Sequence, residues 1–487
     1  MKNYQLLFFS LLFGTLSYAQ VGVNTTTIDP SAALDIQFQD PNQAKGLLTP
    51  RMNTVQRTTK ITSPADGLIV YDTDLKSFYH YNASTSSWVK MNSEANGRSK
   101  FKRIKSVADL APELSGGKYV LATDTYYEVN GTIIVDAPID INNAYLVGLD
   151  ANEDRLIKNS GILFQGTKGG TIKNLTISKA GGSLQVFDLT GDATGSPLVG
   201  TQNLIVRDCI IAGCNSIGTV SGFNLAFFAV VQYASNTTGI TFSNTAQLLL
   251  SNIGWFGNNS GTFETFTGSF NLLQKLGGFS DVKSGAIGVD VSSNPTIIND
   301  AVLESVVFTG ASSQYVKPYT VGTYTGFNFN NRWNVRSAGI PNETDADATG
   351  NLYYQSSSVV NLNSTTAFKL PVNTNSIRLF RTAEGAGANS ENRLIYEGAK
   401  SRALNVLGAL SFTATAGSRY VFSIYKNGSK VTGSDVEADV TTTNARQSVS
   451  IIGTVDVVKN DYIEIYMQKP APGSEQILIT TYNFIFN

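Results

Sequence analysis

Charged side chains are scarce in this sequence of 487 residues, whose formal net charge is −1. Asp, Glu, Lys and Arg together make up 15% of it, against roughly a quarter in an ordinary globular chain. Without a large basic field, the chain has no means of holding a nucleic acid backbone or an anionic membrane surface. We therefore expect neither partner.

Cysteine and histidine are also rare, with two Cys and one His. Cys209 and Cys214 could form a short-loop disulfide in an oxidising compartment, but Cys209 stands at an apolar strand position, where a buried thiol is usual. The sole histidine, His80, is too distant in sequence to suggest a Cys–His catalytic pair. With no second ligand near it, we interpret His80 as a strand residue that faces solvent or a subunit contact.

Long hydrophobic runs are missing after the first twenty residues. Lys2, the apolar run 6–16 and the small-residue site ahead of Gln20 predict a signal peptide over residues 1–19. The run is too short to span a bilayer, so we expect no transmembrane segment and a secreted or cell-surface protein, with the periplasm as an alternative. A signal that ends in Ala-Gln, on a chain rich in Asn and Thr, resembles exported proteins of the Bacteroidota.

Turn formers and strand formers are what the chain has in abundance, with 44 Gly, 21 Tyr and 26 Phe. Four stretches share one pattern: apolar, polar, then Asn, Asp or Ser, then apolar, any, apolar. They are residues 172–177, 206–211, 250–255 and 303–308. Repeated short strands of this kind predict a solenoid. The steps of 34, 44 and 53 residues exceed a coil of roughly twenty, so each step holds more than one coil or a loop insertion.

The segment before these repeats reads as the start of the same solenoid. Its phrases between Lys118 and Gly148 resemble the opening coils of right-handed parallel β-helices of the pectate-lyase and phage tailspike type. Ser106 and Asp109 form an N-cap arrangement ahead of Leu110, which predicts a capping helix over the open end of the core. We place the β-helix domain at residues 96–357.

Residues 20–95 form a separate module with a distinctive order of phrases. They include Gly46-Leu47-Leu48-Thr49-Pro50-Arg51-Met52 and Gly67-Leu68-Ile69-Val70-Tyr71-Asp72-Thr73. This order resembles the N-terminal attachment module of exported, fibre-like surface proteins of Bacteroidota, which itself resembles pieces of phage tail fibres. The resemblance implies a fibre-like protein and carries no catalytic motif.

Residues 358–487 lack the solenoid repeat and show the pattern of longer antiparallel strands instead. Alternation over residues 420–425 is followed by Asn427-Gly428, the strongest short hairpin signal, and a further strand covers 462–466. This order resembles the antiparallel jelly roll of C1q and tumour-necrosis-factor type, which implies a trimer. The expected fold class is therefore all-β, with a small N-terminal β module, a right-handed parallel β-helix and a C-terminal jelly-roll sandwich.

A β-helix in an exported protein raises the question of polysaccharide cleavage. The Asp-Asp and His-Gly phrases of polygalacturonases and the Arg-any-Pro-any-any-Arg phrase of pectate lyases are absent. Asp208 and Glu304, in neighbouring columns of the repeat, are the remaining catalytic candidates. The alternative is that Asn174, Asp208, Asn252 and Ser305 mark one stacked column whose side chains satisfy turn backbone groups.

Two further sets of residues suggest binding. Asp345 and Asp347 resemble the start of a calcium loop, but Ser356 stands where an acidic residue is expected; we expect no cofactor, with Ca²⁺ at these two residues as the alternative. Aromatic side chains could stack on sugar rings if exposed, or fill the core as usual. These are Trp255, Tyr324 and Trp333, with Phe256, Phe327 and Phe329 nearby.

The sequence thus predicts an exported, non-enzymatic, fibre-like homotrimer that binds a surface or glycan through its β-helix or its jelly-roll tip. Two alternatives stay open: a polysaccharide lyase or glycoside hydrolase that acts on the β-helix face, and a phage-derived structural component.

Overall fold

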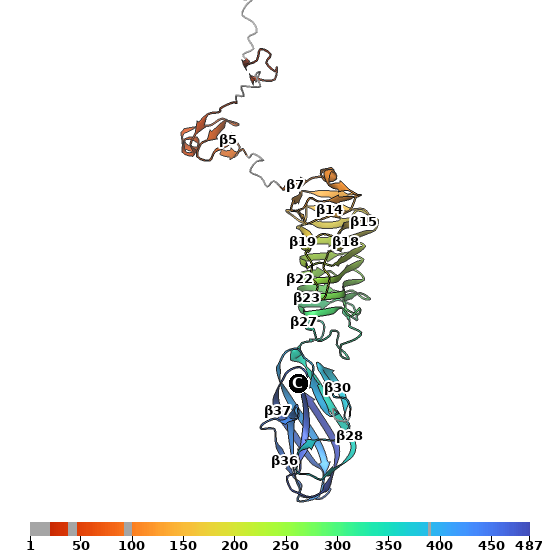
Figure 1. The fold of residues 1–487 in the computed structure, drawn as a ribbon. Helices are drawn as coiled ribbons and strands as arrows, with labels where there is room; N and C mark the ends of the chain where they lie inside the picture. The colour runs from red at the N-terminus through yellow and green to blue at the C-terminus, as the bar shows by residue number, and fades with distance from the viewer. Residues whose placement is uncertain (1–19, 38–45, 92–99, 388–390) are drawn as a thin grey trace, which may run out of the picture. The chain divides into compact units, whose positions relative to one another are not determined.

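The computed structural model describes residues 20–37, 46–91, 100–387 and 391–487 (Figure 1). The chain divides into two compact units, Met1–Ser99 and Lys100–Asn487. Strands hold 55% of the residues and helices 4%, which confirms the all-β expectation. The predicted signal peptide, residues 1–19, lies outside the described residues.

The N-terminal unit contains a parallel strand pair and a four-stranded sheet. The pair is β1 (Val21–Val23) and β2 (Leu34–Ile36), and the sheet is β3 (Arg51–Met52), β4 (Ile69–Asp72), β5 (Ser77–Asn82) and β6 (Ser87–Lys90). Helix η1 (Gln56–Lys60) places the buried Arg57 against the sheet, where its Nε lies 2.9 Å from Asp72 and its guanidinium 3.9 Å from the centre of the Tyr79 ring. His80 is a half-buried residue of β5, so its interpretation as a strand residue is confirmed.

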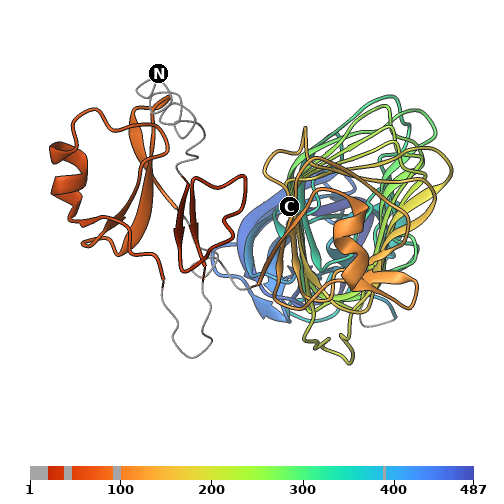
Figure 2. The ribbon, with the colours of Figure 1, turned by 90° about the horizontal axis from the view of Figure 1, so that it is seen from above.

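The second unit begins with a parallel β-solenoid of about nine turns. Its coils stack as layers in Figure 1 and overlay one another when seen from above in Figure 2. The short strands that begin face 1 are β7 (Phe101–Ile104), β10 (Tyr126–Val129), β13 (Tyr145–Val147) and β16 (Gly170–Lys173). Those that begin face 2 are β11 (Thr132–Val135), β14 (Arg155–Lys158) and β17 (Thr176–Lys179).

Face 3 consists of short strands through most of its length. They are β9 (Lys118–Val120), β12 (Ile139–Asp140), β15 (Gly161–Gly166), β18 (Leu184–Thr190), β20 (Ser216–Ser221), β24 (Ile287–Asp290) and β26 (Val316–Lys317). From the middle of the solenoid onward, longer strands pass around the corners and serve two or three faces. They are β19 (Asn203–Ala212), β21 (Leu225–Ala234), β22 (Thr238–Trp255), β23 (Thr262–Asp281) and β25 (Thr296–Thr309), and the shorter β27 (Trp333–Ala338) pairs with the last of them.

The strand register confirms the predicted solenoid and explains its irregular steps. Ile172 pairs directly with Val206, so the step of 34 residues is one coil with an insertion. Val206 pairs with Phe228, and Phe228 pairs with Leu250, so the step of 44 residues holds two coils. The step of 53 residues also holds two coils.

The inward side chains build one continuous hydrophobic core along the solenoid. Aromatic rings stack inside it, as Trp255 does on Phe263 with 4.4 Å between centroids. One ion pair lies within this core: Lys275 Nζ is 2.8 Å from Glu264 Oε1, and both side chains are buried. Burial raises the pKa of Glu264, and the neighbouring Lys275 opposes that rise.

The corner between faces 1 and 2 explains the third residue of the sequence repeat. Asn174, Asp208, Asn252 and Ser305 all have left-handed backbone, with φ of 53°, 55°, 51° and 59°. Asn and Asp tolerate this conformation better than most residues. The predicted stacked column is therefore present, and what its members share is the backbone conformation that bends each coil.

A second corner is held by buried side-chain amides. Asn236 Nδ2 donates to Ile211 O at 2.9 Å, and Asn259 Nδ2 donates to Tyr233 O at 2.6 Å. Asn236 also donates its backbone N–H to Asn259 Oδ1 at 2.8 Å, which links adjacent coils. These bonds satisfy corner backbone groups that would otherwise be buried without a partner.

Both cysteines lie in the solenoid core as free thiols. Burial raises the pKa of Cys209 and that of Cys214 to about 12. The interpretation of Cys209 as a buried, stacked residue is confirmed, and the disulfide alternative is not formed.

The first coil is closed as predicted, by a short 3-10 helix, η3 (Val107–Glu113), with a capping box between Ser106 and Asp109. Leu110 of this helix is buried in the solenoid core. Strand β8 (Leu114–Ser115) then turns back against β9. Lys102 of β7 forms an ion pair with Glu113 of η3 at 2.8 Å, which ties the cap to the first strand of the solenoid.

The C-terminal domain consists of two antiparallel sheets around a second hydrophobic core. One sheet has the order β30 (Asn375–Phe380), β28 (Thr349–Leu362), β39 (Glu475–Phe486), β33 (Arg402–Thr413) and β37 (Gln447–Val457). The other contains β29 (Phe368–Lys369), β31 (Thr382–Glu384), β32 (Arg393–Tyr396), β34 (Arg419–Lys426), β35 (Ser429–Lys430), β36 (Val436–Asp439) and β38 (Tyr462–Gln468).

The first long strand of this domain, β28, pairs with the last, β39, and the chain passes back and forth between the sheets. Asn427 and Gly428 both have positive φ at the predicted β34–β35 hairpin. The domain begins at Thr349, ahead of the expected boundary at 358. A register shift between Gln355 and Ser358 interrupts the alternation of β28, so the first half of this strand was not recognisable in the sequence. The resemblance to C1q and tumour necrosis factor stays a prediction.

Asp154 provides a test of how the coils are linked. Its buried carboxylate accepts backbone N–H groups from Gly131 at 2.7 Å, Leu149 at 2.6 Å and Asp150 at 3.0 Å. Burial alone would raise the pKa of Asp154, but these N–H donors hold it below its usual value. The stabilisation is therefore fully present above the unfolded pKa, about 3.9, and is lost as pH falls through the folded pKa.

We predict that Asp154→Asn lowers the free energy of unfolding by about 1–2 kcal/mol at pH 7, and that the difference from wild type shrinks below about pH 4. Urea denaturation at fixed protein concentration measures both values. The matched control is Asp150→Asn, which alters an exposed neighbour that bonds only within its own turn. An equal difference at pH 7 and pH 3 would contradict this assignment.

Candidate functional site

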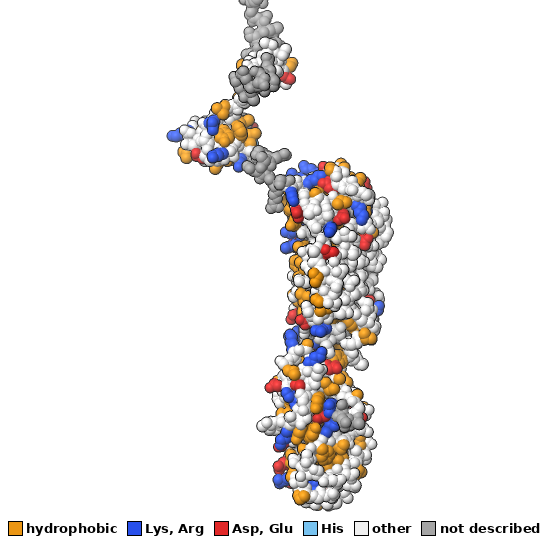
Figure 3. Space-filling model, viewed as in Figure 1, with side chains coloured by type: hydrophobic (Ala, Val, Ile, Leu, Met, Phe, Trp, Pro, Cys, Tyr) orange, Lys and Arg blue, Asp and Glu red, His pale blue; other side chains and the backbone are white. Residues whose placement is uncertain are grey.

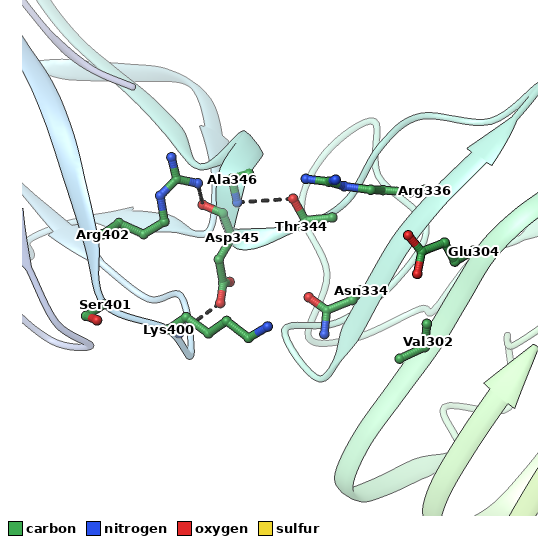
Figure 4. Close-up of a pocket in the computed structure, with 10 residues that line it drawn as sticks. All are labelled: Val302, Glu304, Asn334, Arg336, Thr344, Asp345, Ala346, Lys400, Ser401 and Arg402. Atoms are coloured by element: carbon green, nitrogen blue, oxygen red, sulfur yellow. Dashed lines mark hydrogen bonds between the residues drawn. The ribbon is translucent and has the colours of Figure 1, made fainter.

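A cavity of about 510 Å³ lies where the last coils of the solenoid meet the C-terminal domain (Figure 4). We refer to it as the junction cleft. Its lining residues are Val302, Glu304, Asn334, Arg336, Thr344, Asp345, Ala346, Lys400, Ser401 and Arg402.

Strands β25 and β27 build one wall of the junction cleft. Glu304 and Arg336 are register partners across these two strands. Because side chains alternate along a strand, the buried Leu303 and Val335 face the core while Glu304 and Arg336 face outward. The strand register thus places Glu304 and Arg336 next to each other on the outer side of the sheet, and the Arg336 side chain extends toward Thr344 (Figure 4).

The opposite wall comes from η4 (Asp345–Asp347) and the loop that enters β33. Arg402 Nη1 donates to the backbone oxygen of Asp345 at 2.6 Å, which fixes its guanidinium at the cleft. Within the described part of the chain, Arg336 and Lys400 have no ion-pair partner within 4.0 Å. The cleft therefore offers cationic groups from both walls, with Glu304 as an accompanying acceptor.

Arg381 connects the two walls of the cleft through an ion pair and hydrogen bonds. Its buried guanidinium pairs with the Asp345 carboxylate and donates to Trp333 O at 2.5 Å and to Glu343 O at 3.0 Å. The other oxygen of Asp345 accepts the backbone N–H of Lys400 at 2.9 Å. Asp345 is thus a structural acceptor whose bonds position the cleft loops.

A second cavity of about 460 Å³ adjoins the junction cleft and shares Ser401 and Arg402 with it. Its charges are more fully matched, because Lys426 lies 3.6 Å from Asp461 and donates to Asp456 O at 2.9 Å. Together the two cavities could accommodate a ligand longer than one sugar ring.

The structure separates the two catalytic candidates. Glu304 lines the junction cleft, whereas Asp208 pairs with Arg207 at 2.9 Å, four coils away along the solenoid. At about 4.8 Å per coil they are about 19 Å apart along the axis, whereas paired glycosidase carboxylates are about 5–9.5 Å apart. Asp208 and Glu304 cannot act on one bond within a single chain.

The calcium candidates are committed to bonds within the protein. Asp347 accepts the backbone N–H of Thr344 at 3.0 Å and its hydroxyl at 2.6 Å, which makes it the N3 partner of Thr344 in the capping box of η4. A calcium ion at Asp345 would have to displace Arg381. In the described ranges no group of three or more His, Cys, Asp or Glu side chains could hold a metal ion.

Of the three aromatic candidates, the two tryptophans belong to the interior and Tyr324 is half-buried. Trp255 and Trp333 are fully buried, and Trp333 Nε1 donates to Tyr319 at 3.0 Å. Tyr324 donates to Glu397 at 2.6 Å, and burial together with this bond raises its pKa. Their interpretation as packing residues therefore accounts for all three, while Phe256 is 42% exposed beside Phe279.

Sequence reasoning missed Arg336, Lys400 and Arg402. The alternating segment 333–338 could have identified Arg336 as an outward strand residue. Lys400 and Arg402 gave no comparable signal, because their position depends on the contact between Asp345 and the loop at Ala399.

In the described ranges, none of the helices is both long and apolar enough to cross a membrane.

The buried ion pair between Arg381 and Asp345 leads to a stability prediction. Arg381→Met should lower the free energy of unfolding by about 3–5 kcal/mol, because it leaves the buried Asp345 carboxylate without its cationic partner. Thermal and urea unfolding measure the change. Arg378→Met is the matched control, since Arg378 is an exposed arginine of β30 that shares the positive φ of Arg381. Adding Asp345→Asn should recover part of the loss, and an unchanged double variant would argue against a buried-charge cause.

Comparisons with known proteins bear mainly on the N-terminal unit. A family model described as a phage tail-like trimerisation region matches residues 22–106. The match covers the N-terminal unit and extends through β7, the first strand of the solenoid. No curated protein matches the chain.

Among solved structures, the chain is similar to the enzymatically active domain of tailspike protein 4 of bacteriophage CBA120. The two share 10% identity over 85% of each chain, with a TM-score of 0.26. At this TM-score the likeness supports no inference about the present chain. The family resemblance is therefore confined to residues 22–106, which are similar to a phage tail-like trimerisation region.

Proposed function

We propose that this chain forms a homotrimeric, fibre-like structural protein whose β-solenoid is the shaft and whose junction cleft binds an acidic glycan. The observation that carries the proposal is the match of residues 22–106 to a trimerisation region that runs directly into the first coil. A module that joins three chains at this point would bring three solenoids together at one end.

The charges of the junction cleft support the ligand class. Arg336 and Lys400 come from opposite walls, and Arg402 lies between them and the second cavity. Guanidinium and ammonium groups bind carboxylates and sulfates through charge-assisted hydrogen bonds, while Glu304 would accept from a sugar hydroxyl. A polysaccharide that carries uronic acid or sulfate groups has this combination.

Cleavage of such a polysaccharide is the second candidate, because Glu304 and Arg336 lie side by side in an open cleft. A hydrolase needs a second carboxylate near Glu304, and the nearest cleft carboxylate, Asp345, is paired with Arg381. We therefore favour binding without cleavage. The cleavage assay described below tests whether a neighbouring subunit supplies the second carboxylate.

Export rests on the sequence of residues 1–20. In this proposal the mature chain is secreted or displayed on the cell surface. The proposed Bacteroidota origin, and the proposed jelly roll of C1q and tumour-necrosis-factor type at the C-terminus, rest on sequence resemblance.

The proposal predicts the mass of the mature protein in solution. Light scattering on the full mature chain should give three times the chain mass, because the matched region would join three copies. A chain that stays monomeric at micromolar concentration would contradict the trimer.

The proposal also predicts ligand preference. Calorimetric titration should detect binding to uronic acid or sulfated oligosaccharides but not to neutral ones, and Lys400→Ala or Arg336→Ala should weaken it about tenfold, or roughly 1.4 kcal/mol. Lys283→Ala, an exposed lysine outside the cleft, is the matched control. The same mixtures should show no fall in chain length, and depolymerisation that Glu304→Gln abolishes would favour the enzyme instead.

A further inference from the structure

An apolar column runs along the outer side of face 1. Its positions are register partners from coil to coil, beginning at Phe101 in β7. Its apolar members in the first seven coils are Phe101, Tyr126, Tyr145, Ile205, Phe227 and Leu249.

From Tyr126 onward these side chains point away from the core, because their neighbours in sequence are the inward core residues, and Phe101 is the register partner of Tyr126. Phe101 and Tyr145 are 41% and 47% exposed, and the other four are half-buried. Figure 3 shows hydrophobic side chains along the left margin of the solenoid, where Figure 1 labels β7, β19, β22 and β23. At about 4.8 Å per coil the column extends over roughly 30 Å, which is unusual for a surface that stays in water.

The outer side of face 3 provides the contrast within the same solenoid. Its register column reads Gln165, Asp188, Thr219, Thr241, Thr265 and Asp290. The same coils therefore present hydroxyl, amide and carboxylate groups on face 3, and rings and aliphatic chains in the face 1 column that begins at Phe101. A second outward column of face 1 carries the charged residues Arg103, Glu128, Lys173 and Arg207. The contrast therefore concerns the Phe101 column, and it indicates that this strip of face 1 is covered while face 3 is solvated.

Val230 adds an independent observation at the corner beside face 1. It occupies the left-handed column with φ of 54°, where neighbouring coils carry Asp208 and Asn252. A β-branched residue is strained in this conformation, and Val230 is nevertheless 45% exposed. An exposed apolar side chain gains nothing in water to offset that strain, so a contact surface accounts for it better.

We propose that face 1, with Val230 at its edge, is the surface through which the three solenoids of the trimer pack against one another. The inference rests on the proposed trimer. The region that matches a trimerisation region ends within the first coil and includes Phe101, the first member of the column. Three copies joined there and running parallel would place equivalent coils at the same height. In a three-fold arrangement each chain meets its neighbour with two different strips of surface, and the apolar column and its corner supply them.

Thiol labelling tests the inference on the full mature chain. Thr171 lies in the face 1 column between Tyr145 and Ile205, and Thr241 lies in the face 3 column, both half-buried. The native thiols Cys209 and Cys214 are buried and contribute little background. In the trimer, a maleimide should label Thr171→Cys at least tenfold more slowly than Thr241→Cys, and the two rates should converge in denaturant.

Each outcome decides between the two proposals. Equal labelling rates in a protein of trimeric mass would overturn the packing face and leave the trimer standing, whereas a monomeric mass would overturn both. Protection of Thr171→Cys that appears only after a polysaccharide is added would assign face 1 to a glycan and also overturn the inference.

A second pair of variants keeps the test independent of Thr171. Gln274→Cys occupies the same column four coils further on and should be protected in the same way. Val230→Asn relieves the backbone strain and removes apolar contact, so it should leave the circular dichroism spectrum unchanged while Thr171→Cys labelling becomes several-fold faster. Unchanged labelling in the Val230→Asn background would exclude Val230 from the interface.

Discussion

The stacking of coils in exact register is the constraint on which the rest of this structure depends. Parallel strands on neighbouring coils hydrogen-bond only if each coil turns its corners at matching heights, and the coils from Asn174 to Ser305 each place a residue in the left-handed conformation between faces 1 and 2. Asn, Asp, Ser and Gly fill this position in most coils. At the other corner, the buried Asn236 and Asn259 bond to backbone oxygens and to each other's coil.

The same constraint explains the low charge of the chain. Every coil contributes inward positions to one narrow core, and a charge at such a position requires a partner at the same level or the next. Lys275 and Glu264 meet this requirement inside the solenoid, and Arg381 and Asp345 meet it at the junction. Arg336 and Lys400 instead lie at the surface, and they reach the junction cleft from opposite walls.

The sequence predicted the solenoid because its repeat reflects the corner itself: Asn174, Asp208, Asn252 and Ser305 are the residues that bend the chain. The capping box at Ser106 and the hairpin at Asn427 were predictable for the same reason, since local backbone geometry determines them. The start of the C-terminal domain was misplaced because the bulge after Gln355 breaks the alternation of β28. The junction cleft could not be predicted, because Arg336 and Lys400 meet only through tertiary contacts that Arg381 organises.

Closure of the solenoid at its first coil has a consequence for its behaviour at high concentration. A parallel coil whose edge is open can accept another molecule's edge, and repeated addition of this kind leads to open-ended filaments. Here η3 places Leu110 over the core, and β8 folds back on β9 in the antiparallel sense, so the first coil offers no matching template. The length of the shaft is therefore set by the number of coils in one chain, because other molecules cannot add to its capped end.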